Sequence, residues 1–278
     1  MNVLEFSLLV AVSSLLAGFL GALTGLGGGV VLVPALSIFF HVDIRYAIGA
    51  SLISVIATSS GAAAAYVKEG FSNIRIGMFL EIATTLGALL GAFLALHVPT
   101  TALAVIFGLV LLYSAYLSGR DQPIVPEDDH PDPLATRLRM NGTFPTPQGL
   151  RSYNVRSVPA GFGLMAVAGI LSGLLGIGSG ALKVIAMDRV MKIPFKVSTT
   201  TSNFMIGVTA AASAGVYLNR GYIDPGLAMP IMLGVLAGSF LGSRVLPAAH
   251  TRSLRIVFGV TIVVLGAQMI YKGLGGRI

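Results

Sequence analysis

Two glycine-rich stretches, Gly25-Leu26-Gly27-Gly28-Gly29 and Gly176-Ile177-Gly178-Ser179-Gly180, decide how this chain folds. Each lies inside a long apolar run, although a glycine costs about 1 kcal/mol relative to alanine inside a helix. A broken helix also frees backbone N–H and C=O groups, which hydrocarbon cannot satisfy. The two stretches therefore predict helices interrupted near the middle of a membrane, with the following helix start aimed at something polar.

The composition predicts an all-α polytopic membrane protein. Of the 278 residues, 55% are hydrophobic and only 10% are charged, whereas soluble domains carry about 25% charged residues. The apolar runs are long and uninterrupted, which favours helices over a β-barrel. The net charge of +7 comes from basic residues in short loops and reads as a topology signal, so no nucleic-acid partner is expected. The chain has no cysteine, which excludes disulfides and thiol catalysis.

The chain is an internal duplication. A shift of 151 residues carries Gly25 onto Gly176 and Ser51 onto Ser202 without a gap, and it still matches Phe107-Gly108 with Phe258-Gly259. Such repeats are the usual build of secondary transporters. The predicted divisions are a first membrane repeat (1–118), a polar linker (119–157) and a second membrane repeat (158–278). The linker is rich in proline and charge, and we expect an extended surface tether with one hairpin near Asn141-Gly142; a regulatory role is the alternative.

The length of the second apolar segment bears on how the repeats are oriented. Val30 to Phe40 is 11 residues, or about 16 Å of helix against a hydrocarbon core of about 30 Å. The segment cannot span alone, so it either turns back as a re-entrant hairpin or continues one broken span. A re-entrant hairpin followed by three spans inverts the second repeat, whereas a broken span followed by three does not.

Positive charge favours inversion. With inverted repeats, 13 of the 17 basic residues outside the apolar segments fall on one side, against 10 of 17 with parallel repeats. The positive-inside rule then predicts two inverted-topology repeats, each a glycine-broken re-entrant helical hairpin plus three transmembrane helices. It places the linker in the cytoplasm and both termini outside.

The glycine breaks are the first candidates for a substrate site. Helices starting near Gly29 and Gly180 would present free N–H groups and about half a positive charge at the midplane, which suits an anion. The expected binding residues at the breaks are Gly25, Gly27, Gly28, Gly29, Gly176, Gly178, Ser179 and Gly180. The alternative is close helix packing by small residues, which accounts well for Gly18, Gly21, Gly87 and Gly91.

Two charged residues lie inside apolar segments. Lys183 follows the second break, where the first half has Leu32, and we expect it to be the counter-charge of the anion; snorkelling or a pair with Asp188 is the alternative. Glu81, whose counterpart is Met232, is a candidate for proton coupling or a structural acid paired with an arginine.

Neutral polar residues complete the candidates. Ser51, Ser202 and Asn203 stand out among the hydroxyls and amides of the third segments, which can hold oxyanions or join neighbouring helices. The four histidines have no metal-ligand spacing. No set of nucleophile, base and orienting group is present, so we expect neither an enzyme nor a cofactor nor a metal.

Gly25 to Pro34, its repeat at 176–185 and the turn Gly221-Tyr222-Ile223-Asp224 resemble the TauE/SafE sulfite exporter family over nearly the whole chain. The resemblance implies an inner-membrane permease for sulfur-containing anions such as sulfite or organosulfonates. The second motif departs from the pattern at Ser179, Ile185 and Lys183, which bears on the particular substrate and the direction of transport.

The leading hypothesis is a multi-pass secondary transporter of the inner membrane that moves such anions by alternating access around the two breaks. A permease for another small solute or a cation held by Glu81 is one rival. A membrane scaffold or assembly protein without transport is the other. The substrate, the coupling ion and the oligomeric state stay open at this level.

Overall fold

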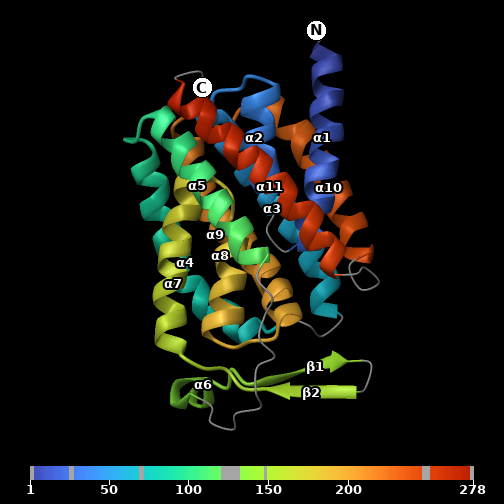
Figure 1. The fold of residues 1–278 in the computed structure, drawn as a ribbon, viewed down its shortest axis with the longest axis vertical. Coiled ribbons are helices and arrows are strands. Elements are labelled where there is room, and N and C mark those ends of the chain that lie inside the picture. The colour runs from blue at the N-terminus through green and yellow to red at the C-terminus, as the bar shows by residue number, and fades with distance from the viewer. Residues whose placement is uncertain are drawn as a thin grey trace.

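A computed structural model describes residues 3–24, 28–68, 72–119, 132–146, 149–245 and 251–275. Most of these residues are helical (Figure 1). The elements in chain order are α1 (Val3–Thr24), α2 (Gly29–Phe39), α3 (Ile44–Lys68), α4 (Ile74–Ala95), α5 (Thr100–Gly119), α6 (Pro133–Arg137), β1 (Gly142–Thr146), β2 (Gly149–Tyr153), α7 (Val158–Leu175), α8 (Gly180–Ile185), the π-helical turn η1 (Ala186–Val190), α9 (Phe195–Asn219), α10 (Pro225–Val245) and α11 (Thr251–Leu274).

The helices have the length and composition of membrane spans. Within the described ranges, four are long and apolar enough to cross a bilayer: Glu5–Leu23, Ile74–Ala95, Val158–Leu175 and Pro225–Val245. Shorter apolar stretches lie in α2, α3, α5 and α11. Large aliphatic side chains also stand exposed along the outer faces, such as Leu90 in α4 and Leu233 in α10. These features make the chain a multi-pass membrane protein, as its composition predicts.

The two halves of the chain are interleaved. Helix α1 packs along α10, α4 along α7, and α5 along α11, while α3 and α9 contact each other at the centre. A shift of 151 residues turns the α1–α10 pair into the α7–α4 pair. The same exchange relates the α3–α10 and α9–α4 contacts. Each half therefore covers the other, and the pattern of contacts follows the duplication in the sequence.

Glycines allow the outer pairs to approach closely. A methyl group at Gly91 of α4 would lie 2.8 Å from the carbonyl carbon of Ile170 in α7, and one at Gly173 of α7 would lie 2.7 Å from the amide nitrogen of Ala92. In the other pair, a methyl at Gly18 would lie 2.7 Å from the Cα of Val235. These glycines bring backbone against backbone. The packing interpretation of Gly18, Gly87 and Gly91 matches these contacts.

The ends of the molecule differ. In Figure 1 the start of α1 and the end of α11 lie at one end, and α6, β1 and β2 lie at the other. Two hydrogen bonds agree with this view at the first end, where Lys272 donates to Ile38 O at 3.0 Å and Arg45 donates to Val98 O at 3.1 Å. The end of α2, the start of α3, the α4–α5 connection and the end of α11 therefore lie together at this end of the molecule.

The described part of the linker is folded rather than extended. Strands β1 and β2 form an antiparallel hairpin, with Gly142 opposite Tyr153. The expected hairpin is present, but Asn141-Gly142 lies at the start of β1 and not at the turn of the hairpin. The reason is a hydrogen bond: Asn141 Oδ1 accepts from Val155 N at 2.9 Å and closes the open end of the hairpin.

We call α6, β1 and β2 the cap. Polar contacts join the cap to the helices. Asn73, which caps the start of α4, donates from its amide to Met140 O at 2.9 Å and to the Tyr153 hydroxyl at 2.8 Å. Burial raises the pKa of the Tyr153 hydroxyl, and the hydrogen bond from Asn73 opposes that shift. Asp132 caps α6 through Leu134 N and also accepts from Val158 N at 3.0 Å. The cap is thus tied to the starts of both α4 and α7.

Candidate functional site

Two helical hairpins, α1–α2 and α7–α8–η1, bring their tips to the central helix α3. In the first, the ring of Phe6 near the start of α1 meets the ring of Phe40, just after α2, edge to face with centroids 5.6 Å apart. In the second, Arg156 N, just before α7, donates to Met191 O, just after η1, at 3.0 Å. Each contact brings the start of the first helix of a pair close to the end of the segment that follows it. The first contact lies at the end that holds Lys272, and the second lies at the end that holds the cap.

The described residues of the two tips lie against each other and against α3. Ser51 in α3 donates to Gly176 O at 2.7 Å. A methyl group at Gly29 would lie 3.0 Å from the same carbonyl oxygen, and one at Gly178 would lie 2.9 Å from Val55. The sequence prediction that the two breaks face each other is consistent with these contacts. Gly25 and Gly27 lie outside the described residues.

The second tip turns through left-handed backbone. Gly176 and Gly178 have φ of +67° and +68°, and Ser179 has φ of +48°. Glycine adopts this region without strain, whereas for serine this backbone conformation is energetically unfavourable. Ser179 precedes α8 but makes no side-chain capping hydrogen bond. Its hydroxyl is left facing the interior.

Several buried polar groups of the second tip and of α9 have no hydrogen-bond partner among the described residues. Both polar atoms of the Asn203 side chain are in this state, and so are the hydroxyls of Ser179 and Thr199. Asn203 is fully buried, with Ser179 and Thr199 at 1% and 4% exposure. A buried polar group left unpaired costs about 1–3 kcal/mol, and native structures contain few of them. Asn203 and Thr199 are four residues apart and share one face of α9.

A hydroxyl from α3 fixes the backbone beside this face. Ser59 Oγ donates to Asn203 O at 2.6 Å and joins α3 to α9. On the tip side, Ser202 donates to Gly180 O at 3.4 Å, a longer bond than the one from Ser51. Gly28 lies near Thr58, since a methyl group on that glycine would be 3.4 Å from the hydroxyl. The structure therefore gathers the described site candidates at the seam between α3, α9 and the two tips.

Beside this seam lies a buried ion pair. Lys183 Nζ in α8 stands 3.5 Å from Glu81 Oε2 in α4, and the lysine side chain is fully buried. Lys183 also donates to the hydroxyl of Thr209, which in turn donates to Glu81 Oε1 at 2.5 Å. Thr85 donates to the same oxygen at 3.2 Å. We call Glu81, Lys183 and Thr209 the charged triad.

The triad corrects two alternatives weighed from the sequence. Lys183 is paired with Glu81 rather than with Asp188, and Glu81 is paired with a lysine rather than with an arginine. The sequence marks both charges as candidates but does not pair them, and Thr209 is not among the site residues predicted from it. A signal was available: each charge replaces an apolar residue of the other half, Leu32 or Met232, and two such exceptions in one duplicated chain suggest a pair.

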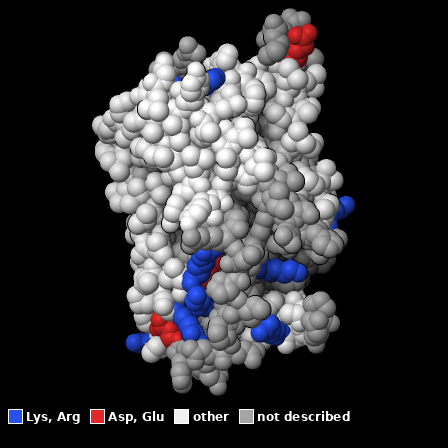
Figure 2. Space-filling model, viewed as in Figure 1, with Lys and Arg blue, Asp and Glu red and all other residues white. Residues whose placement is uncertain are grey.

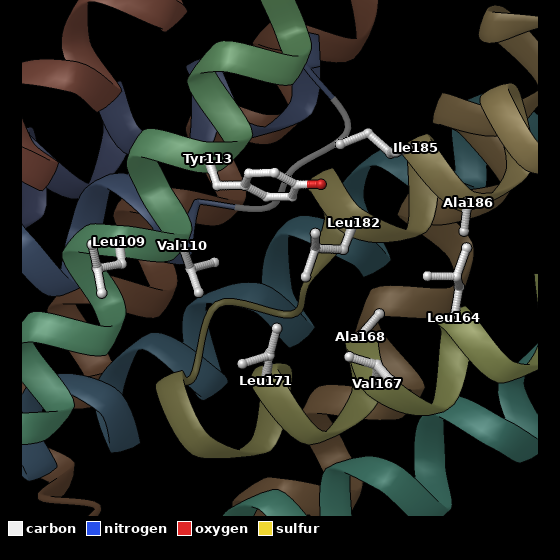
Figure 3. A pocket seen from close by; sticks show the side chains of 10 residues that line it. All are labelled: Leu109, Val110, Tyr113, Leu164, Val167, Ala168, Leu171, Leu182, Ile185 and Ala186. Carbon is white, nitrogen blue, oxygen red and sulfur yellow. The ribbon is translucent and has the colours of Figure 1, made fainter.

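A cavity of about 380 Å³ opens between α5, α7 and α8 (Figure 3). Its lining is aliphatic except for Tyr113, and it lies on the side of α8 that carries Leu182 and Ile185. A small hydrated anion would find almost no polar partner there. The polar seam, not this cavity, is the candidate functional site. The described residues contain no cluster of acids or histidines suited to a metal ion.

A helical multi-pass protein with buried polar and charged groups at its centre belongs to the class that includes solute permeases. The chain is a member of the sulfite exporter TauE/SafE family, whose profile matches residues 10–269.

The relatives of this chain are named as probable membrane transporter proteins. The chain is 28% identical to the probable membrane transporter protein YunE of Bacillus subtilis (strain 168), over 98% of this chain and 99% of the relative. It is 26% identical to YdhB of the same organism, covering 83% and 84% of the two chains, and 23% identical to MJ0441 of Methanocaldococcus jannaschii, covering 94% of each. No solved structure matches the chain.

Proposed function

We propose that this protein is a secondary transporter that moves small sulfur-containing anions, such as sulfite or organosulfonates, across the inner membrane by alternating access. The substrate binds at the seam between the two hairpin tips and the helices α3 and α9. One observation carries the proposal: the fully buried Asn203 side chain has both polar atoms unpaired among the described residues, beside a tip whose Ser179 hydroxyl is also unpaired. Amide N–H and hydroxyl groups suit the oxygens of a sulfite or sulfonate group.

The family and its relatives support the class of function, since their names describe exporters and membrane transporters. The charged triad weighs against a cation permease, because the carboxylate of Glu81 is already held by Lys183 and Thr209. The scaffold alternative does not account for unpaired polar groups at the centre of the bundle, which cost stability if they serve packing alone. Transport of an anion gives them a use.

The proposed transporter consists of two inverted repeats with re-entrant hairpins. The Phe6–Phe40 and Arg156–Met191 contacts support this arrangement, because they lie at opposite ends of the molecule. Figure 2 shows Lys and Arg side chains gathered mainly over the end that holds β1 and β2. By the positive-inside rule this end faces the cytoplasm, and both termini face outward.

Single-cysteine labelling tests this topology. The native chain has no cysteine, so each introduced thiol is the only one. We expect Ser152→Cys, exposed on β2, to react with a membrane-impermeant maleimide only after the cells are opened. Gly275→Cys, exposed after α11, should react in intact cells. Labelling of both positions from one side would contradict inverted repeats.

The substitution Asn203→Leu tests the binding site. Leucine is the residue at the equivalent position of the first half, Leu52, which is fully buried. Because hydrogen bonds to a charged group contribute about 1.5–3 kcal/mol, the affinity for the anion should fall about tenfold or more. The measurement is thermal stabilisation of the purified protein over a titration with sulfite and with ethanesulfonate.

The matched control is Ser239→Ala, which removes a buried hydroxyl that donates to Leu236 O within its own helix. This variant should bind anions as the native protein does. Unchanged affinity in Asn203→Leu would remove that residue from the site. If neither anion stabilises the native protein, the result contradicts anion binding and favours the scaffold alternative.

A further inference from the structure

Within the charged triad, Lys183 contacts both Glu81 and Thr209. We propose that Lys183 exchanges partners in each transport cycle: it pairs with Glu81 when the site is empty, and with the anion when Glu81 is protonated. One proton then moves with each anion in the same direction. This inference rests on the proposed anion transport and specifies its coupling.

The contacts within the triad suit an exchangeable pair. The 3.5 Å between Lys183 Nζ and Glu81 Oε2 is longer than the 2.7–2.9 Å of a tight charge-assisted hydrogen bond. Thr209 bridges the two groups, since it accepts from Lys183 and donates to Glu81. When Lys183 leaves, the carboxyl keeps hydrogen bonds from Thr209 and Thr85. Neither group depends on the direct contact alone.

Lys183 lies close enough to the seam to serve the anion. Its backbone N–H donates to Ser179 O at 3.0 Å, so it belongs to the first turn after the tip. Thr209 and Asn203 are six residues apart on α9, about 9 Å along the helix axis and about a third of a turn around it. The flexible four-carbon stem of a lysine can carry the ammonium group across part of that distance. Lys183 can therefore move from Glu81 toward a ligand held by Asn203.

Charge conservation in the buried site sets the stoichiometry. The empty site holds one positive and one negative charge and is neutral. An anion entering without a proton would leave one uncompensated negative charge in a buried environment, which is strongly unfavourable. Transfer of one proton to the Glu81 carboxylate restores neutrality, and the anion takes the ammonium group of Lys183. Both the empty and the loaded states are then neutral and can reorient.

The surrounding helices supply few other titratable groups. Helix α7, which packs along α4, has no ionisable side chain. Helix α9 carries Lys196 in its first turn and Tyr217, whose hydroxyl donates to Gly173 O at 3.3 Å. Turn η1 carries Asp188 and Arg189 beyond α8, and α4 itself begins with Arg75. Among the described residues, Glu81 is the carboxylate in contact with Lys183.

The test uses proteoliposomes and radiolabelled ethanesulfonate, a monoanion whose own charge does not change with pH. Counterflow of this anion by the native protein tests transport itself. A proton gradient of one pH unit, with the acidic side outside the vesicles, should drive about tenfold accumulation of ethanesulfonate inside them. For a neutral loaded carrier the accumulation should not respond to a potassium–valinomycin potential. These native measurements stand whether or not any variant folds.

The substitution Glu81→Gln removes the carboxylate that would take up the proton and keeps an oxygen that can accept from Thr209. We expect it to abolish accumulation driven by the pH gradient, and the counterflow that remains should no longer depend on pH. Glu5→Gln, an exposed carboxylate in α1, is the control and should accumulate as the native protein does.

The two failures are distinguishable. No counterflow by the native protein contradicts the transport proposal. Counterflow without accumulation in a pH gradient, or accumulation that persists in Glu81→Gln, overturns the coupling while leaving transport standing. Accumulation driven by the membrane potential alone also overturns it.

Discussion

The double variant Glu81→Met/Lys183→Leu should fold as stably as the native protein and yet transport no anion. Each substitution installs the residue that the other half carries at the equivalent position, Met232 or Leu32, and Leu32 is fully buried there. Replacing a buried ion pair by apolar residues of similar volume is often neutral or stabilising. The double variant therefore removes the charge but not the packing.

The single variants provide the contrast. Lys183→Leu alone leaves the Glu81 carboxylate buried without its counter-charge, and breaking a buried pair in this way costs about 3–5 kcal/mol. We expect poor yield and a lowered thermal midpoint for this variant, and recovery of the midpoint in the double variant. Thermal unfolding in detergent and ethanesulfonate counterflow are the two measurements. A double variant that still carries ethanesulfonate would show that the triad is structural.

The second large effect is expected at Gly176. A methyl group at this position would lie 2.6 Å from Ile48 Cγ2 and 2.9 Å from Ile48 O, in a backbone conformation with φ of +67°. Left-handed backbone costs a residue with a side chain about 1–2 kcal/mol, and overpacking adds about 1–3 kcal/mol. Gly176→Ala should thus lose about 2–5 kcal/mol of stability. It should also displace the Gly176 carbonyl oxygen that accepts the hydrogen bond from Ser51.

Gly221→Ala separates the two contributions. Gly221 has φ of +74°, but a methyl group there meets nothing within 4 Å. This variant should lose only the backbone contribution and keep its transport activity. The measurements are the thermal midpoint and counterflow of both variants in parallel. If Gly176→Ala is no worse than Gly221→Ala, the close approach of the tip to α3 is not what holds the hairpin in place.

Much of the arrangement can be predicted from sequence because it depends on local chain properties. The 11-residue segment after the first break is too short to span a bilayer, and in the structure it forms the short helix α2, whose end meets the start of α1 through Phe40 and Phe6. Small residues at a spacing of four predict close packing, and Gly87 and Gly91 indeed meet α7 backbone. Both predictions follow from helix geometry and glycine chemistry, without knowledge of which helix is the neighbour.

The parts that escape prediction depend on contacts between distant segments. Glu81 and Lys183 are 102 residues apart in sequence, and their pairing requires α4 and α8 to meet across the two halves. The role of Asn141 depends on Val155 on the far side of the hairpin. The sequence marks Asn203 as a polar residue in an apolar segment, but that its side chain has no partner among the described residues appears only when the neighbouring side chains are in place.

The exchanged pairing of α1 with α10 and of α7 with α4 bears on how this chain could be divided. A fragment ending before the linker would retain α1 and α4 but lose the helices that fill their glycine-lined grooves. The sequence repeats are therefore not autonomous folding units. Two severed halves would have to be synthesised together and find each other in the bilayer before either acquired a packed interior.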